Sequence, residues 1–327
     1  MSTREFKGRY CSPVGPLLEQ FVHEKKACGY RYDEAARLLL RFDRFLCNEA
    51  LSSCELPRSI SRKWLAKQPH ESVSTHCNRI GAVRQFAMYL CRSGYPADVP
   101  DRSLWAKRAE SFSPRILTHA EIQRLFNALD ELAPTAKAPL RHLIMPEIFR
   151  LLYGCGMRVG EVLRLRVVDV DLDRGVLMVR DAKFGKDRMV PPALPLVQRL
   201  RTYAALMGRR PPDGYFFPSP SGGPWSSEAV YEMYRELLMH CEIAHAGRGK
   251  GPRVHDLRHA FATHALLRWC REGADLDVKL PILATYMGHR SLAGTQRYLH
   301  LIAELMPEIT VRTNATFGDV IPRGTVS

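Results

Sequence analysis

Residues 176–191 read VLMVRDAKFGKDRMVP, and this stretch distinguishes the chain from a purely helical protein. Residues 176–180 and 188–191 are short runs rich in apolar residues, and a polar segment with a glycine lies between them. Two such runs around a short glycine-containing segment are typical of a β-hairpin. We therefore expect two antiparallel strands here, joined by a turn with basic residues.

Helical patterns flank this hairpin on both sides. Thr118 and Glu121 have the spacing of a capping box, in which each side chain bonds the other residue's backbone at the start of a helix. The second half of the chain is therefore expected to be a mixed α+β domain. Its other helices are predicted near residues 139–154, 158–165, 194–207, 226–242, 256–272 and 291–301.

Residues 13–93 show helical patterns and no strand pattern. Ser59 or Ser61 is expected to cap a short third helix, and Ser72 a long fourth one. The prediction is a bundle of four or five short helices. The first two apolar stripes consist of Leu17, Leu18, Phe21 and Val22, and of Ala35, Leu38, Leu39, Phe42, Phe45 and Leu46.

Residues 95–116 have the character of a linker, because prolines and charges interrupt any periodicity. A length of 327 residues also favours two domains. We expect a helical domain over residues 1–106 and a mixed domain with a C-terminal tail over residues 107–327. The fold class is then mainly α with a small β-sheet.

Basic residues exceed acidic ones in both predicted domains. The chain has 48 Lys and Arg against 34 Asp and Glu, a formal charge of +14, of which +6 falls on residues 1–106 and +8 on the remainder. A hydrophobic content of 46% excludes a wholly disordered basic tail. The charge favours a polyanionic partner, which could be DNA, RNA or an anionic membrane surface. Two basic bodies joined by a linker could close around a rod-like polyanion.

Other classes of protein lack support in the sequence. The N-terminus has no apolar run typical of a signal peptide, and no run approaches the ~20 residues that span a bilayer. The nine cysteines form no Cys-x-x-Cys pair, so we expect reduced thiols. His255 and His259 have helical i, i+4 spacing but no evident third ligand, and no phosphate-binding glycine loop occurs. We therefore expect no metal and no cofactor.

Six residues stand out in a fixed order along the chain. They are Arg158 in GCGMR, Lys183 in the hairpin turn, His255 and Arg258 in HDLR, His289 in YMGH, and Tyr298 in QRYLH. In this order the chain resembles the tyrosine recombinase family, which includes phage integrases and Xer-type recombinases. The resemblance covers nearly the whole chain and implies a helical (SAM-like) core-binding domain followed by a catalytic domain.

Breaking a DNA strand without a metal requires a nucleophile, stabilisation of the charge that develops on phosphorus, and a proton for the leaving oxygen. Arg158 and Arg258 suit the second task, because a guanidinium is planar and permanently charged. The resemblance implies that Tyr298 forms a 3′-phosphotyrosyl bond. Such a bond conserves the energy of the phosphodiester, so no ATP is needed.

The family pattern also implies the remaining roles. Lys183 would be the general acid, with Lys186 as the alternative, because Ala182 and Phe184 stand where many relatives have glycines. His255 would transfer a proton for the tyrosine, and His289 would bind the phosphate or support the site. Glu161 is expected to orient an arginine, whereas His259 and His264 are expected to pack or hydrogen-bond on their own helix. Gly294 and Thr295 replace paired threonines with no chemical consequence expected.

The resemblance implies a site-specific recombinase, of Xer-like or transposon type, that is cytoplasmic, bacterial or phage-encoded and associated with the nucleoid. Its partner would be double-stranded DNA with inverted half-sites, bound by four protomers that form a Holliday junction, with room for accessory DNA-bending or recombinase partners. The C-terminal segment would dock on a neighbouring protomer or pack on its own chain. Candidate DNA contacts are Arg79, Arg84, Lys186, Arg248 and Lys250.

Two alternatives remain open at this point. A type IB topoisomerase or a telomere resolvase uses similar residues, although a separate helical N-terminal domain favours recombination. A DNA-binding accessory protein without catalysis is the other, and the presence of all six residues speaks against it.

Overall fold

The computed structural model describes residues 10–30, 32–49, 51–101, 103, 114–180, 187–245, 247, 251–289, 291–296 and 298–299. The chain divides into two compact units, Met1–Phe112 and Ser113–Ser327. The domain boundary expected between residues 106 and 107 lies outside the described residues. The expected fold class, mainly helical with one small sheet, is confirmed. Among the described helices, none has the length and apolar character needed to cross a bilayer.

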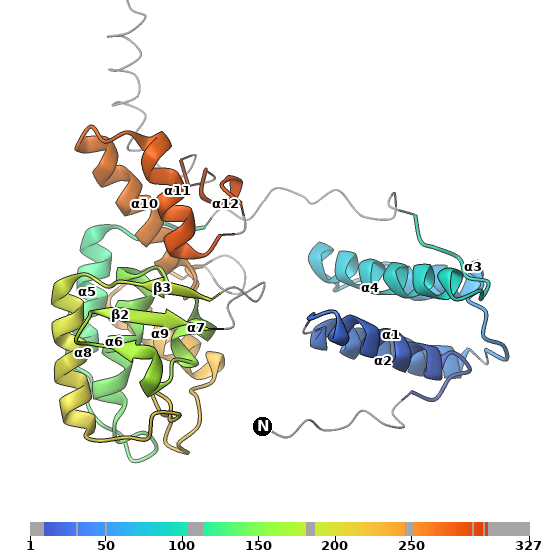
Figure 1. The fold of residues 1–327 in the computed structure, drawn as a ribbon, viewed down its shortest axis with the longest axis horizontal. Coiled ribbons are helices and arrows are strands. Elements are labelled where there is room, and N and C mark those ends of the chain that lie inside the picture. Colours follow the sequence, from blue (N-terminus) through green and yellow to red (C-terminus); the bar gives the residue numbers. More distant parts are fainter. Residues whose placement is uncertain are drawn as a thin grey trace, which may run out of the picture. The chain divides into compact units, whose positions relative to one another are not determined.

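The N-terminal unit is a bundle of four described helices, in which α4 contacts each of the other three (Figure 1). Ser72 caps α4 as expected, since its hydroxyl accepts a hydrogen bond from the backbone N–H of Thr75 at 3.1 Å. The expected serine cap of the third helix is wrong, because the helix begins directly after the extended Pro57. The helices are α1 (Gly15–Ala27), α2 (Asp33–Asn48), α3 (Arg58–Leu65) and α4 (Val73–Arg92).

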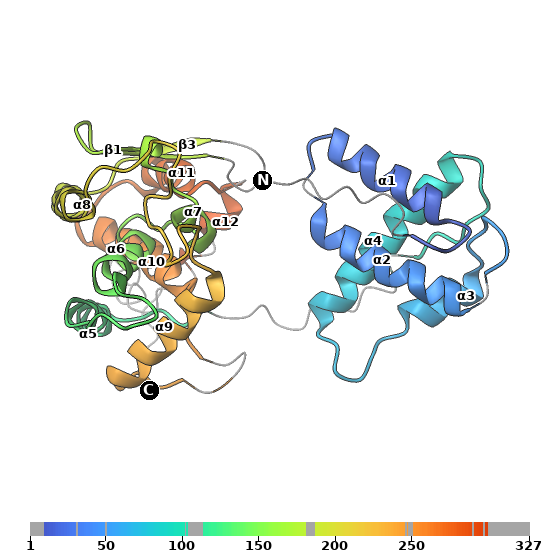
Figure 2. The same ribbon diagram turned by 90° about the horizontal axis from the view of Figure 1, so that it is seen from below.

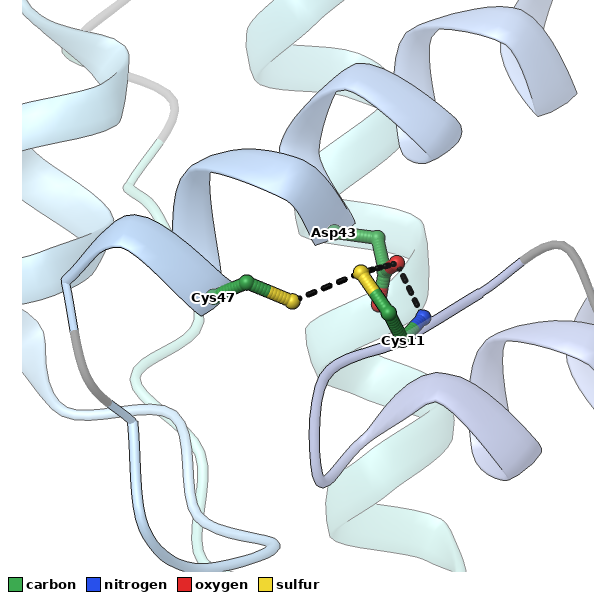
Figure 3. A group of neighbouring side chains, drawn as sticks. All are labelled: Cys11, Asp43 and Cys47. Carbon is green, nitrogen blue, oxygen red and sulfur yellow. Dashed lines mark hydrogen bonds between the residues drawn. The ribbon is translucent and has the colours of Figure 1, made fainter.

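Asp43 on α2 fixes the segment that precedes α1 (Figure 3). Its buried carboxylate accepts hydrogen bonds from the backbone N–H of Cys11 at 2.6 Å and from that of Ser12 at 3.1 Å. The Ser12 hydroxyl donates to it as well. Because several donors share one buried acceptor, this carboxylate ties the start of the chain to the bundle.

The C-terminal unit places its sheet at one edge, α6 and α10 through the middle, and α5 and α9 at the opposite edge (Figure 2). The sheet is antiparallel in the order β1–β2–β3, with Leu177 paired to Val190, which confirms the predicted hairpin. Thr118 and Glu121 form the predicted capping box of α5. The first elements are α5 (His119–Asp130), α6 (Arg141–Gly154), α7 (Val159–Leu163), β1 (Val170–Asp171), β2 (Val176–Val179) and β3 (Arg188–Val190).

Five helices of the described residues follow the sheet, and two of them differ from the prediction. The helix at α11 was not expected, because Pro281 interrupts its sequence pattern, although Asp275 caps its start. The helix expected over residues 291–301 is in the described part only a single turn. The elements are α8 (Leu194–Met207), α9 (Ser227–His240), α10 (Asp256–Arg271), α11 (Leu276–Met287) and α12 (Ala293–Gln296).

The anchor at Asp43 yields a test of stability. Asp43→Asn replaces one acceptor by an amide group that faces backbone donors, so we expect the free energy of unfolding of the N-terminal unit to fall by about 2–3 kcal/mol. Asp33→Asn is the control, because Asp33 lies on the same helix with an exposed ion pair to Lys26, and such pairs contribute less than about 1 kcal/mol. Calorimetric unfolding of the full chain measures both. Equal effects of the two substitutions would contradict this role of Asp43.

Candidate active site

Arg158 lies immediately before α7 and connects that helix to the end of α11. Its guanidinium donates to Glu161 Oε1 at 2.6 Å and to the carbonyl oxygen of Gly288 at 2.9 Å. Its backbone N–H donates to Glu161 Oε2 at 2.9 Å. The side chain is 22% exposed, so it remains accessible to a ligand.

Arg258 on α10 is held in the same way, but it is buried. Its guanidinium donates to the carbonyl of Met287 at 2.8 Å and also to that of Gly156. Desolvation, and then the charge of Arg158, lower the pKa of Arg258 to about 10. It therefore stays charged at neutral pH. Both arginines bind carbonyls at the C-terminal end of α11, so that end of the helix sets the spacing of the two cations.

The backbone supports these contacts at two glycines. Gly156 has φ of +57°, and a Cβ there would lie 2.3 Å from the ring of Phe261. Gly288 ends α11 with φ of +67°, a left-handed conformation that side chains other than glycine rarely adopt. The glycines of GCGMR and YMGH therefore place the carbonyls that the arginines bind.

Glu161 joins Arg158 to a third arginine, Arg188 on β3. Arg188 donates to both carboxylate oxygens of Glu161, at 3.0 and 2.8 Å, and to the carbonyl of Tyr286 at 3.0 Å. Desolvation raises the pKa of Glu161, but the hydrogen bonds from Arg188 and Arg158 outweigh it and hold the pKa at about 2. Glu161 contacts an arginine as expected, and Arg188 is a site residue that the sequence analysis missed.

Tyr298 packs among buried residues of α10 and α11 and is itself 4% exposed. Its hydroxyl lies 3.0 Å from His259 Nδ1, and the two rings are 5.5 Å apart. From its sequence context, His259 is expected to pack or hydrogen-bond on its own helix. The structure instead brings it to the candidate nucleophile, 39 residues away in the chain.

The other two histidines complete the cluster. His255 meets the ring of His259 edge-on, with centroids 4.8 Å apart. His289 stacks near Tyr298, and its Nδ1 lies 2.7 Å from the hydroxyl of the buried Thr295. Thr295 was expected to have no chemical consequence, but the structure makes it the residue that orients His289.

Positive charge dominates this cluster, since three guanidiniums face one carboxylate. Desolvation of its ring, then its neighbour His259 and the charges of Arg258 and Arg158, lower the pKa of His255. Desolvation and the same two arginines lower the pKa of His289 to about 4. Both imidazoles are therefore neutral at neutral pH. A cluster with this excess of positive charge suits an anion such as a phosphodiester.

Several predicted residues fall elsewhere. Lys183, Lys186, Arg248 and Lys250 lie outside the described residues. The structure argues against base contact by Arg79, because its guanidinium is buried against Glu71 at 2.7 Å. It also donates to the carbonyl oxygen of Ala66 at 2.9 Å, which leaves it poorly placed to reach DNA.

Among the described residues, one trio of side chains could hold a metal ion, formed in the N-terminal unit by Cys11, Asp43 and Cys47 (Figure 3). Its two sulfur atoms lie 2.7 Å apart. Both oxygens of Asp43 already accept hydrogen bonds from Cys11 and Ser12, which gives this carboxylate a structural role. The trio is separate from the cluster around Tyr298.

Comparison with known proteins gives the family. The model of the phage integrase family matches residues 115–304. The chain is 31% identical to putative integrase/recombinase y4rB of Sinorhizobium fredii, over 92% of this chain and 97% of that protein. It is also 31% identical to tyrosine recombinase XerD of Vibrio cholerae, over 91% and 96% of the two chains. The chain therefore belongs to the phage integrase family. It is a tyrosine recombinase, an enzyme that breaks and rejoins DNA strands.

Solved structures share its fold. An integrase of the transposon Tn1549, in complex with transposon right end DNA, has a TM-score of 0.60 at 17% identity, covering 86% of this chain and 94% of that one. The XerH recombinase bound to its palindromic difH substrate has a TM-score of 0.59 at 18% identity, covering 84% and 78%. These likenesses support the fold that the sequence predicted.

The buried carboxylate of Glu161 predicts a pH-dependent loss of stability. Because its pKa is lowered in the folded protein, the contribution of Glu161 to the free energy of unfolding is fully present above about pH 4.5. This contribution is lost as the pH falls through about 2. Glu161→Gln is expected to lower the free energy of unfolding by about 3 kcal/mol at neutral pH, because two arginines lose their counter-ion. The difference in free energy of unfolding between the wild type and Glu161→Gln should become smaller toward pH 2.

Urea unfolding of the C-terminal unit, followed in the full chain between pH 2 and pH 7, measures this difference. Arg174→Gln is the control, because its ion pair with Asp171 is exposed and 3.8 Å long. A deficit for Glu161→Gln that stays constant with pH would contradict the assignment.

Proposed function

We propose that this recombinase cleaves DNA by attack of the Tyr298 hydroxyl oxygen on a phosphodiester, which forms a 3′-phosphotyrosyl bond and releases a 5′-hydroxyl. One observation carries the proposal. Tyr298 packs in the same apolar cluster as Met287 at the end of α11, and the carbonyls of Met287 and Gly288 there bind Arg258 and Arg158. A nucleophile and two fixed cations are thus supported by one helix end.

The two arginines would bind the non-bridging oxygens of the phosphate. Their carbonyl partners fix them before DNA arrives, so little reorganisation accompanies the build-up of charge on phosphorus. Glu161 and Arg188 would hold Arg158 from behind. His289, oriented by Thr295, and His255 would add neutral hydrogen-bond donors to the same phosphate.

The leaving 5′-oxygen needs a proton, and we assign it to Lys183, with Lys186 as the alternative. This assignment rests on the family resemblance. It is supported by the place of Lys183 in the sequence between β2 and β3, because β3 carries Arg188 into the site.

For the whole chain we propose recombination at a duplex site with inverted half-sites. Four protomers would exchange the strands of two duplexes, with a Holliday junction as the DNA intermediate. The two basic domains, residues 1–106 and 107–327, would bind one half-site between them. Related recombinases are seen with palindromic or transposon-end DNA, which supports such a substrate. Arg84, half-buried beside the carbonyl of Pro100, stays a candidate DNA contact, as do Lys186, Arg248 and Lys250.

Two alternatives can be separated from this proposal, one by plasmid relaxation and the other by adduct formation. A topoisomerase-like strand transferase would relax supercoiled plasmid as a monomer without site preference. A silent accessory protein would bind the duplex but form no covalent adduct.

The nucleophile can be tested with a duplex that the protein selects from a random pool, nicked so that cleavage becomes irreversible. The wild type should accumulate a covalent protein–DNA adduct, and Tyr298→Phe should form none, because its ring has no oxygen to attack phosphorus. Tyr203→Phe is the control, since that buried hydroxyl donates to the carbonyl of Phe216 away from the site. An adduct with Tyr298→Phe would refute the assignment.

Arg258 should act on the rate of cleavage more than on DNA binding. Arg258→Lys replaces the planar guanidinium, whose two terminal nitrogens bind the Gly156 and Met287 carbonyls, by one ammonium nitrogen that cannot keep this spacing. We therefore expect adduct formation to slow by about 100-fold or more. Affinity for the duplex, measured by filter binding, should change by less than about threefold, because it is spread over many phosphate contacts.

The matched control is Arg201→Lys, because Arg201 also donates to a carbonyl, that of Leu172, but on the exposed side of α8. It should cleave within about twofold of the wild type. If DNA affinity and cleavage rate fell together for Arg258→Lys, the role of Arg258 would be in DNA binding and not in the cleavage step.

A further inference from the structure

The hydroxyl of Tyr298 already has a hydrogen-bonding partner in the protein. His259 Nδ1 lies 3.0 Å from it, within the range at which a proton passes between oxygen and nitrogen. His255 contacts the ring of His259 instead, and within the described residues it makes no hydrogen bond to Tyr298. The histidine nearest the oxygen is therefore not the one that the family pattern singles out.

We propose that His259 is a catalytic residue that takes the proton from Tyr298 as the tyrosine attacks the phosphate. This inference rests on the proposed function, in which Tyr298 is the nucleophile. His255 then acts on the phosphate or on the ring of His259.

The step balances in atoms and charge. The proton of the Tyr298 hydroxyl passes to His259 Nδ1 while the bond from the tyrosine oxygen to phosphorus forms. The bond from phosphorus to the 5′-oxygen breaks, and that oxygen takes a proton from Lys183. In rejoining, the 5′-hydroxyl gives its proton to Lys183 as its oxygen bonds to phosphorus, and His259 returns its proton to the Tyr298 oxygen that leaves.

Other titratable and charged groups surround the pair, and a substitution at His259 leaves all of them in place. Loss of His259 also removes its effect on the pKa of His255, so proton transfer is assigned to His259 only if the rate falls and the pH profile becomes hydroxide-dependent together. These groups are His255 and Arg258 around the start of α10, Arg158 and Glu161 at α7, Arg188 on β3, and His289 after α11.

The same helix supplies a matched pair outside the site. His264 Nδ1 lies 2.9 Å from the hydroxyl of Tyr153, and its ring stacks on His119 at 3.8 Å. The pair has the same two chemical groups at nearly the same distance as His259 and Tyr298. His264→Asn therefore controls for the loss of a structural histidine–tyrosine contact on α10.

The experiment measures single-turnover adduct formation on the nicked selected duplex between pH 6 and pH 9. The side-chain oxygen of His259→Asn can accept the tyrosine's hydrogen bond but cannot take its proton. We expect this variant to be about 100-fold or more slower at pH 7. Its rate should rise about tenfold for each pH unit, because solvent hydroxide must now remove the proton. His264→Asn should stay within about twofold of the wild type, with the same pH profile.

A second substrate separates the two ends of the reaction. A sulfur atom in place of the bridging 5′-oxygen leaves without protonation, so it should restore cleavage by Lys183→Ala but leave His259→Asn slow. A wild-type rate for His259→Asn, an unchanged pH profile, or its recovery on the sulfur substrate would each overturn the inference. The proposed function fails separately, if the wild type forms no adduct or Tyr298→Phe forms one.

Discussion

The site depends on a buried carboxylate that is shared by two guanidiniums. Glu161 binds Arg158 from its own turn of helix and Arg188 from the hairpin. A buried carboxylate of this kind is stable only while both partners remain, because an uncompensated charge in the interior is costly. One acidic residue thereby joins α7 to the sheet and keeps Arg158 beside the carbonyl of Gly288.

The sequence predicted the fold wherever a local rule operates. The capping box at Thr118, the cap at Ser72 and the two strands around the hairpin all depend on residues a few positions apart. The helix α11 escaped prediction because Pro281 removes a backbone donor within it, and packing against α10 compensates. Tertiary contacts of this kind carry no signal in a single window of sequence.

In the candidate site as well, the residues found from the sequence are those in recognisable local motifs. The motif residues Arg158, Arg258 and Tyr298 were found from their order and context, and the structure places them in one cluster. Arg188, Thr295 and His259 were missed as site residues, since each is recognised only by its partner. The partners of Arg188 and His259 are 27 and 39 positions away. Thr295 is close to its partner His289 in the sequence, but its role depends on the direction in which the His289 side chain points.

The left-handed glycine at residue 288 also limits how far the nucleophile can travel. Its carbonyl is held by Arg158, and Tyr298 follows ten residues later. A fully extended chain covers at most roughly 3.6 Å per residue, so this tether is at most about 36 Å long. As long as Arg158 binds the carbonyl of Gly288, Tyr298 stays within about 36 Å of that carbonyl. A phosphate that Tyr298 attacks, as proposed above, must therefore lie within this distance of Gly288.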